Sequence, residues 1–306
     1  MSSTDWYFKD AIEARDELTK KQERAIRHSY NQWASEVREE ARNLSRTSGS
    51  QSEQRELAQL YYELRNASRQ LSAEINNEVS SNINQMGSVV VRTNQRWLSS
   101  LGLSTDALDY KMSASKDSAI RSILSGNLYQ NNKPLSERVW QTTDGNLQDI
   151  YSVIARGIAL DQSPYEIAKQ LEKYLNPSQN LGWTVQSYTD SNGRLKFARV
   201  HNSQVDWRAQ RLARTMLQHS YQQSLVALTK DNPFVKGYIW HAQGDACELC
   251  ADRDGQFYTA ETLPLDHPNG QCDFEVAVDE EKAVNDLAGF YENPIEYPDI
   301  QRFVSD

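Results

Sequence analysis

The stretch from Tyr238 to Val278 reads YIWHAQGDACELCADRDGQFYTAETLPLDHPNGQCDFEVAV and holds all three cysteines of the chain. Together with one histidine, the cysteines form the pattern C-x-x-C-x16-H-x4-C. Two cysteines three positions apart can present both sulfur atoms to one point, and a later histidine and cysteine can complete a tetrahedron around Zn²⁺. The pattern therefore predicts a zinc site with the ligands Cys247, Cys250, His267 and Cys272.

Short strands are expected on both sides of these ligands. Residues 238–240 (Tyr-Ile-Trp) have the composition of a strand, and residues 254–255 (Asp-Gly) are typical of a tight turn. Phe274, Val276 and Val278 alternate with Asp273 and Glu275, as on a half-buried strand. Residues 233–278 are therefore expected to form a small zinc-ribbon-like β subdomain with its ligands on loops.

Two other interpretations of the cysteines are a disulfide and small buried side chains without a metal. An odd cysteine count and the close spacing of two cysteines argue against a disulfide framework. The first residues, MSSTDWYFKD, are acidic and polar rather than a signal peptide, which favours a reducing cytoplasm. The other histidines occur singly and are assigned no role: His28, His201, His219 and His241, the last being nearest to the cysteines.

Several motifs precede and run through this stretch in a fixed order. They are Leu-Ala-Arg-Thr at 212–215, Lys-Gly-Tyr-Ile-Trp at 236–240, Cys-x-x-Cys at 247–250, Asp-Gly at 254–255 and His-Pro-Asn-Gly-Gln-Cys at 267–272. In the order and spacing of these motifs, residues 130–278 resemble the phage Mu F-like minor head proteins, also called head morphogenesis proteins. The resemblance implies a non-enzymatic capsid component, present in few copies, that acts in head assembly and in packaging or ejection of DNA.

The resemblance also implies partners and a location. The implied partners are the portal protein, the major capsid or scaffolding protein, and viral DNA, with no membrane. The implied location is the capsid interior near the portal vertex of the virion, and the host cytoplasm during assembly. The sequence departs from the family pattern at Met216, where the family has Glu, and at Gly270, where it has a cysteine. Cys272 is therefore the candidate for the fourth ligand.

Composition favours long, exposed helices over a compact enzyme. Hydrophobic residues make up 38% of the chain, and the longest apolar run, 150–160, is interrupted by Arg156 and is too short to span a membrane. Of the net charge of −9, the segment from Asp273 onward contributes −8, from ten acidic residues against Lys282 and Arg302. Because the rest is nearly neutral, general attraction to DNA is not expected.

The chain that precedes the zinc subdomain is expected to be mainly helical. In residues 1–88, apolar side chains repeat at helical spacing on both sides of the polar stretch 45–52, which predicts a long helical hairpin, or arm. The repeating positions are Ile26, Tyr30, Trp33, Val37 and Leu44, then Leu57, Leu60, Leu64, Ala67, Leu71, Ile75 and Val79. The arm either stiffens the fold or docks on other subunits through these stripes.

Residues 89–232 predict a helical body that contains one β-hairpin. Ser163-Pro164 is a strong helix start. Alternating apolar residues on both sides of Asn192-Gly193 predict a β-hairpin over about residues 183–200. Residues 279–306 mix acidic residues with prolines and aromatics, which predicts an extended acidic tail. The expected fold class is α+β, mainly α.

One concentrated positive patch is expected. Arg208, Arg211 and Arg214 recur every three residues and so share a helix face. The return strand of the β-hairpin contributes three more basic residues: Arg194, Lys196 and Arg199. These side chains are either solvated or neutralised by the acidic tail, or they contact DNA phosphates or an acidic partner.

The sequence leaves two further function classes open. A zinc-containing HNH-like nuclease is suggested by Asp266-His267 after a C-x-x-C, but such a site needs a general base besides its metal ligands, and His267 is the last histidine. A zinc-ribbon adaptor could bind nucleic acid through the arginine face. Four protein ligands leave no position for a reactive water, so the zinc is expected to be structural and the protein is not expected to be an enzyme.

Overall fold

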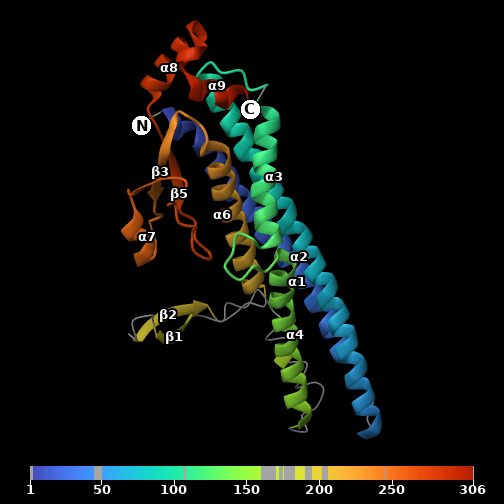
Figure 1. Cartoon of the computed structure of the whole chain (residues 1–306). Helices are drawn as coiled ribbons and strands as arrows, with labels where there is room; N and C mark the ends of the chain where they lie inside the picture. The colour runs from blue at the N-terminus through green and yellow to red at the C-terminus, as the bar shows by residue number, and fades with distance from the viewer. Residues whose placement is uncertain are drawn as a thin grey trace. The chain divides into compact units, whose positions relative to one another are not determined.

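The chain forms two compact units, each assembled from segments that are far apart in the sequence (Figure 1). The computed structural model describes residues 3–44, 50–106, 108–159, 170–171, 175, 183–189, 195–201, 206–244 and 246–305. Unit 1 consists of Met1–Lys21, Val79–Leu135 and Ala213–Asp306, and unit 2 of Gln22–Glu78 and Ser136–Leu212. The units cut across the consecutive regions expected from the sequence, because the long helices contribute to both.

The described residues are mainly helical, with short antiparallel strands, and the expected α+β, mainly α class is confirmed. The helices are α1 (Ser3–Leu44), α2 (Ser50–Ser100), α3 (Asp109–Ser125), α4 (Leu135–Ala159), α6 (Trp207–Thr229), α7 (Glu248–Arg253), α8 (Glu280–Glu292), η1 (Pro294–Glu296) and α9 (Pro298–Ser305). The strands are β1 (Trp183–Thr189), β2 (Leu195–His201), β3 (Val235–His241), β4 (Phe257–Tyr258) and β5 (Asp273–Val278). Within the described residues, no helix is both long and apolar enough to cross a membrane.

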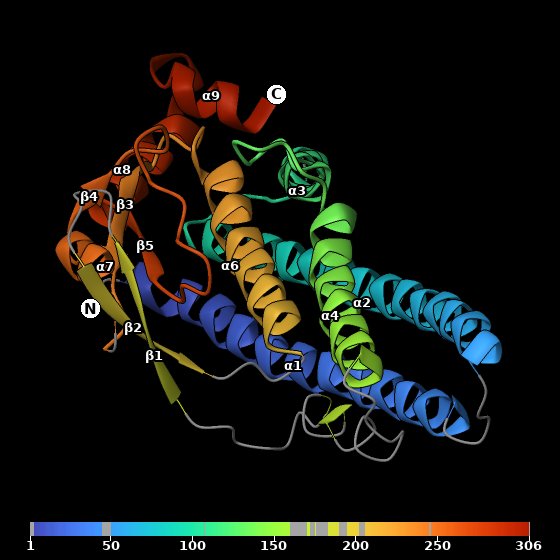
Figure 2. The same cartoon turned by 90° about the horizontal axis from the view of Figure 1, so that it is seen from below.

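Helices α1 and α2 form the predicted helical arm and run side by side in both views (Figures 1 and 2). In unit 1 the start of α1 meets the end of α2, because Phe8 packs on Trp97 with ring centroids 6.1 Å apart and Arg96 pairs with Asp10 at 3.2 Å. The two helices are therefore antiparallel.

The apolar stripes of the arm are buried at the described positions except Ala67, which is half-buried. Ile26, Tyr30, Trp33 and Val37 of α1 are at most 2% exposed, and so are Leu64, Leu71, Ile75 and Val79 of α2. The side chains of Leu44, Leu57 and Leu60 lie outside the described residues. Burial on this scale favours the interpretation of the arm as part of the fold's own core.

The predicted β-hairpin is present in unit 2. Strands β1 and β2 pair antiparallel, from Trp183 opposite His201 to Thr189 opposite Leu195. The expected turn at Asn192-Gly193 and the helix start at Ser163-Pro164 lie outside the described residues.

The core of unit 1 lies between α6 and a three-stranded antiparallel sheet of order β4-β3-β5 (Figure 2). Tyr221 of α6 stacks on Phe274 of β5 at 6.2 Å, and Phe274 meets Trp240 of β3 edge-on at 4.9 Å. All three side chains are at most 1% exposed. This aromatic contact fixes the sheet, and with it the loops that carry the predicted ligands, on α6.

The prediction of an extended acidic tail is wrong, because residues 280–305 are mostly helical. Asp279 caps α8 by accepting the backbone N–H of Lys282 at 3.2 Å, and acidic residues in the first turn suit a helix N-terminus. The prolines occupy first positions of helical segments, where the missing N–H costs nothing: Pro294 in η1 and Pro298 in α9.

Candidate metal centre

Cys247 and Cys250 are brought together by the start of helix α7. Cys247 is the N-cap residue, with extended backbone angles, and its carbonyl accepts the N–H of Ala251 at 2.9 Å. Because Cys250 follows three positions later, the first turn of the helix carries both sulfur atoms to the same side. The predicted C-x-x-C pair is thus a helix-start pair rather than a pair on an extended loop.

His267 reaches the same place on a tight turn. The carbonyl of His267 accepts the N–H of Gly270 at 2.8 Å, and Asn269 adopts a left-handed conformation with φ of 68°. Asparagine tolerates this region better than most residues, which explains the Pro-Asn-Gly sequence of the turn. The turn leads directly to Cys272, the residue before strand β5.

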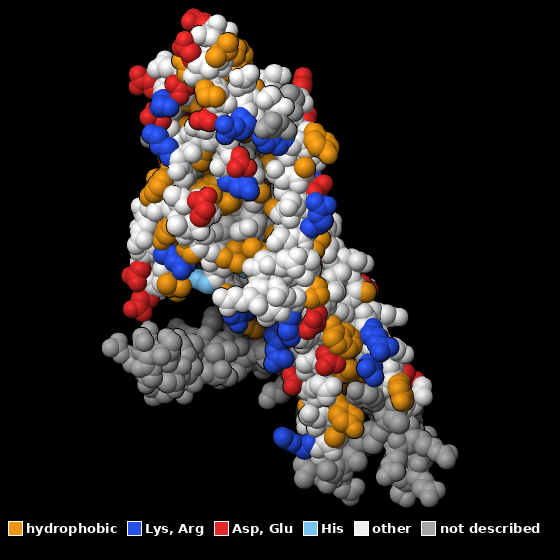
Figure 3. All heavy atoms as spheres, in the orientation of Figure 1, with side chains coloured by type: hydrophobic (Ala, Val, Ile, Leu, Met, Phe, Trp, Pro, Cys, Tyr) orange, Lys and Arg blue, Asp and Glu red, His pale blue; other side chains and the backbone are white. Residues whose placement is uncertain are grey.

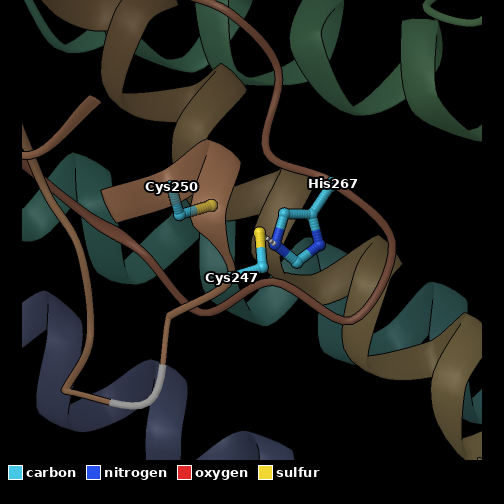
Figure 4. Close-up of side chains that lie close together, drawn as sticks. All are labelled: Cys247, Cys250 and His267. Atoms are coloured by element: carbon cyan, nitrogen blue, oxygen red, sulfur yellow. Dashed lines mark hydrogen bonds between the residues drawn. The ribbon is translucent and has the colours of Figure 1, made fainter. Parts of the chain in front are cut away.

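The imidazole of His267 is oriented as a metal ligand. Its Nδ1 lies 3.1 Å from the carbonyl oxygen of Pro268, which can only accept a hydrogen bond and so favours a proton on Nδ1. In the neutral imidazole with this tautomer, Nε2 has the lone pair, and it lies 3.4 Å from the Cys247 sulfur (Figure 4). A nitrogen and a sulfur bound to one tetrahedral Zn²⁺ would be roughly 3.5 Å apart. The pair fits one edge of a zinc tetrahedron.

The four predicted ligands form two overlapping groups that share Cys250. The donor atoms of Cys247, Cys250 and His267 all lie within 4.8 Å of one another, and so do those of Cys250, Cys272 and Asp266. Figure 4 shows the first group converging from α7 and the His267 turn. Cys272 belongs to the second group only, so the structure brings three of the four predicted ligands together and places Cys272 beside Cys250. Thiols and an imidazole are the donor types of structural zinc sites, so this cluster could hold a metal ion.

Burial raises the pKa of the Cys272 thiol, and the nearby Asp266 carboxylate raises it further. Burial and the adjacent Cys272 and Cys247 raise the pKa of Cys250. Both effects disfavour the thiolate, which is the form that binds zinc, and a bound cation would offset them.

Asp266 holds the backbone on both sides of the turn, a role that sequence reasoning missed. Its carboxylate accepts the backbone N–H of His267 at 2.8 Å and that of Cys272 at 3.1 Å, and a side-chain N–H of Gln218 at 3.0 Å. The residue is 3% exposed. Asp266 therefore sets the spacing between two of the predicted ligands, and an Asp directly before His-Pro was the available signal.

A row of polar residues on α6 receives this loop. Gln218 donates to the carbonyl of Cys272 at 2.6 Å, and Gln222 exchanges hydrogen bonds with the carbonyl of Pro264 and the N–H of Asp266. His219 donates from Nε2 to the carbonyl of Asp266 at 2.9 Å, so its Nδ1 accepts the hydroxyl of Tyr129. His219 is thus a buried, fully bonded side chain and not a ligand.

The same row includes the residues of the Arg-Thr motif. Arg214 donates to the side-chain oxygen of Asn269 at 2.5 Å, and the hydroxyl of Thr215 accepts the backbone N–H of Asn269 at 2.8 Å. Two motifs that are more than fifty positions apart in the sequence therefore meet in space.

Arg15 of helix α1 joins the other end of the loop. Its guanidinium donates to Asp273 at 2.7 Å, to Gln218 at 3.0 Å and to the carbonyl of Cys272 at 3.4 Å. Arg15 is 3% exposed. Burial raises the pKa of Asp273, and the charge of Arg15 offsets part of that shift.

Gly270 has no room for the cysteine that the family pattern places there. A Cβ atom at this position would overlap the carboxylate of Asp266. Gly270 and a buried Asp266 are therefore a matched pair, and Cys272 remains the cysteine of this segment that can serve as a ligand.

Three of the basic residues predicted to form a patch lie on helix α6. Arg208 lies 4.0 Å from Asp149, Arg211 is exposed, and Arg214 bonds to Asn269. The side chains of Arg194, Lys196 and Arg199 lie outside the described residues. Contact with DNA or an acidic partner through these residues stays a prediction.

Neither group of donors includes a further histidine of the described residues. His28 is exposed on α1, the side chain of His201 lies outside the described residues, and His241 pairs with Glu275 at 2.8 Å.

Comparison of the chain with protein-family models, with curated proteins and with solved structures gave no match.

Proposed function

We propose that Cys247, Cys250, His267 and Cys272 together hold one Zn²⁺ ion with a structural role. The ion would join the start of α7, the His267 turn and the start of β5. Two observations support this assignment: His267 Nε2 lies 3.4 Å from the Cys247 sulfur, and the donor atoms of Cys247, Cys250 and His267 all lie within 4.8 Å of one another. When bound, the ion replaces thiol protons and crosslinks segments that the sheet alone holds loosely.

The zinc site is not catalytic in this proposal. Four protein ligands fill a tetrahedral ion and leave no position for a reactive water. A His267 that binds the metal cannot also act as a general base, which removes the basis for an HNH-like nuclease. Incubation with DNA and Mg²⁺, Mn²⁺ or Zn²⁺ is expected to give no cleavage, and nicking that depends on His267 would contradict this assignment.

The chain as a whole is, in this proposal, a minor head protein of a tailed phage that binds the portal and acts in head morphogenesis. The observation that carries this proposal is the contact between two of the motifs on which the resemblance depends. Arg214 and Thr215 bond to Asn269, so the helical motif and the His-Pro motif form one structural element. The order of these motifs in the sequence then corresponds to a direct contact between them in space.

The test of this role is association with a portal protein encoded beside this chain. Co-expression is expected to give a stable complex that survives size-exclusion chromatography. Asp254→Asn serves as a folded control, because the carboxylate of Asp254 is exposed and accepts the N–H of Ala242. Purification of this chain free of the portal protein, with the helical content of a folded protein, would count against the role.

A further inference from the structure

Helix α8 carries two apolar stripes, and only one of them faces the core of unit 1. Ala283 and Leu287 are 1% and 2% exposed, and Phe290 packs against the same core. The second stripe, at Val284, Ala288 and Tyr291, is exposed, with values of 51% for Val284 and 60% for Tyr291. Steps of four and three residues place the second stripe along one helix face. Ile295 of η1 follows it and is 84% exposed.

The exposed stripe is held rigidly by the surrounding contacts. The hydroxyl of Tyr291 donates to the carbonyl of Gly102 at 2.9 Å, and the ring of Tyr297 lies directly on Gly289. Beyond the turn, Ile300 and Phe303 of α9 are buried at 3% and 7% exposure. Ile295 is therefore presented at the tip of a fixed turn rather than on a loose chain end.

Acidic side chains flank this stripe. Glu281, Glu292 and Glu296 are exposed beside it. The basic side chains of the region are engaged locally, because Lys282 pairs with Asp286 at 2.7 Å and Arg302 with Asp299 at 3.7 Å. Figure 3 shows red acidic and orange apolar side chains together at the end of the molecule that holds α8. The face is therefore apolar along its centre and negative at its edges.

We propose that the face formed by Val284, Ala288, Tyr291 and Ile295 docks a basic amphipathic helix of another protein. Such a helix would place aliphatic side chains on the stripe and Lys or Arg beside Glu281, Glu292 and Glu296. Charge selects this occupant over the alternatives. Nucleic acid and anionic membranes are repelled by the carboxylates, and a second copy would bring the same carboxylates against them.

The experiment measures binding of two helical peptides by fluorescence anisotropy with the full-length protein. One peptide has leucine along one face and lysine on both flanks, and the other has glutamate in place of lysine. The basic peptide is expected to bind at least about tenfold more tightly, with an affinity that falls as salt rises. Equal binding of the two peptides, or no binding of the basic one, would overturn the proposal.

Point variants locate the binding face. Ile295→Asn and Tyr291→Asn are each expected to weaken binding about tenfold, because each removes a large apolar contact. Tyr62→Asn is the matched control, because Tyr62 in unit 2 is 62% exposed and Tyr291 is 60% exposed. The Tyr62→Asn variant should bind the basic peptide as the parent chain does. Retained affinity in Ile295→Asn contradicts the proposal. Two other results would also contradict it: a homodimer that is lost in Ile295→Asn, or pelleting with phosphatidylglycerol vesicles that is lost in Ile295→Asn.

Discussion

Replacement of Asp266 by Asn tests whether this buried carboxylate positions the metal ligands. The carboxylate accepts three N–H groups, from His267, Cys272 and Gln218, at 2.8, 3.1 and 3.0 Å. Asparagine has nearly the same shape, but only one of its two terminal atoms accepts hydrogen bonds. Its oxygen can serve Cys272 and Gln218 together, and its NH₂ group then faces the N–H of His267.

The expected cost follows from this mismatch. One hydrogen bond to a charged acceptor is lost, which is worth about 1.5–3 kcal/mol, and a partly buried N–H of His267 is left without an acceptor. We expect a loss of about 3 kcal/mol in the free energy of unfolding and a lower melting temperature by roughly 6–12 °C. Displacement of the His267 turn should weaken zinc binding by about 10–100-fold, as for other groups that orient ligands.

Both quantities can be measured on the same preparation. Zinc affinity is measured by competition with a chromophoric chelator, and stability by thermal unfolding with and without EDTA. Asp254→Asn is the matched control, because Asp254 lies in the same subdomain but its carboxylate is exposed and accepts the N–H of Ala242 at 2.8 Å. The reasoning is refuted if Asp266→Asn binds zinc within twofold of the parent and melts at the same temperature.

Three further changes test other parts of the structure. Gly270→Cys should destabilise the fold by about 2 kcal/mol or more in chemical unfolding, because its Cβ overlaps Asp266; unchanged stability would contradict this packing. Arg15→Met leaves Asp273 buried without its ion pair and should lower the free energy of unfolding by about 3–5 kcal/mol at neutral pH. Protonation of Asp273 relieves this cost, so urea unfolding should show a smaller loss of stability near pH 4. A loss of stability that does not change with pH would refute this reasoning. Burial raises the pKa of Tyr238 to about 12, so its phenol stays neutral in the folded chain, whereas the phenol of an unfolded chain ionises near pH 10. The free energy of unfolding should therefore fall as pH rises from 10 toward 12, and Tyr238→Phe should reduce that slope. An unchanged slope in Tyr238→Phe would contradict this prediction.

The sequence was sufficient to predict the closeness of Cys247 and Cys250 and the helical arm, because both depend on local spacing. Cys247 and Cys250 share a helix turn, and Ile26, Tyr30 and Trp33 recur at the period of a helix face. Sequence spacing could not find the partners of the loop, because they come from distant segments. Gln218 lies 48 positions from Asp266, and Arg15 lies 258 positions from Asp273.

The tail shows why composition misled the prediction. Acidic residues and prolines lower the expectation of a helix when they are counted, but here their positions matter more than their number. Asp279 is an N-cap, and Pro294 and Pro298 begin helical segments. Ile300 and Phe303 recur three positions apart and are buried, a helical spacing that was present in the sequence and was outweighed by composition.

Zinc content, measured by native mass spectrometry on protein purified without added metal, tests the central claim most directly. The parent chain and His241→Ala are expected to carry about one zinc ion per chain, because His241 pairs with Glu275 outside the site. His267→Ala and Cys250→Ser are expected to lose it. A parent chain free of zinc that keeps its melting temperature in chelator, or a Cys250→Ser variant that keeps stoichiometric zinc, would contradict the account.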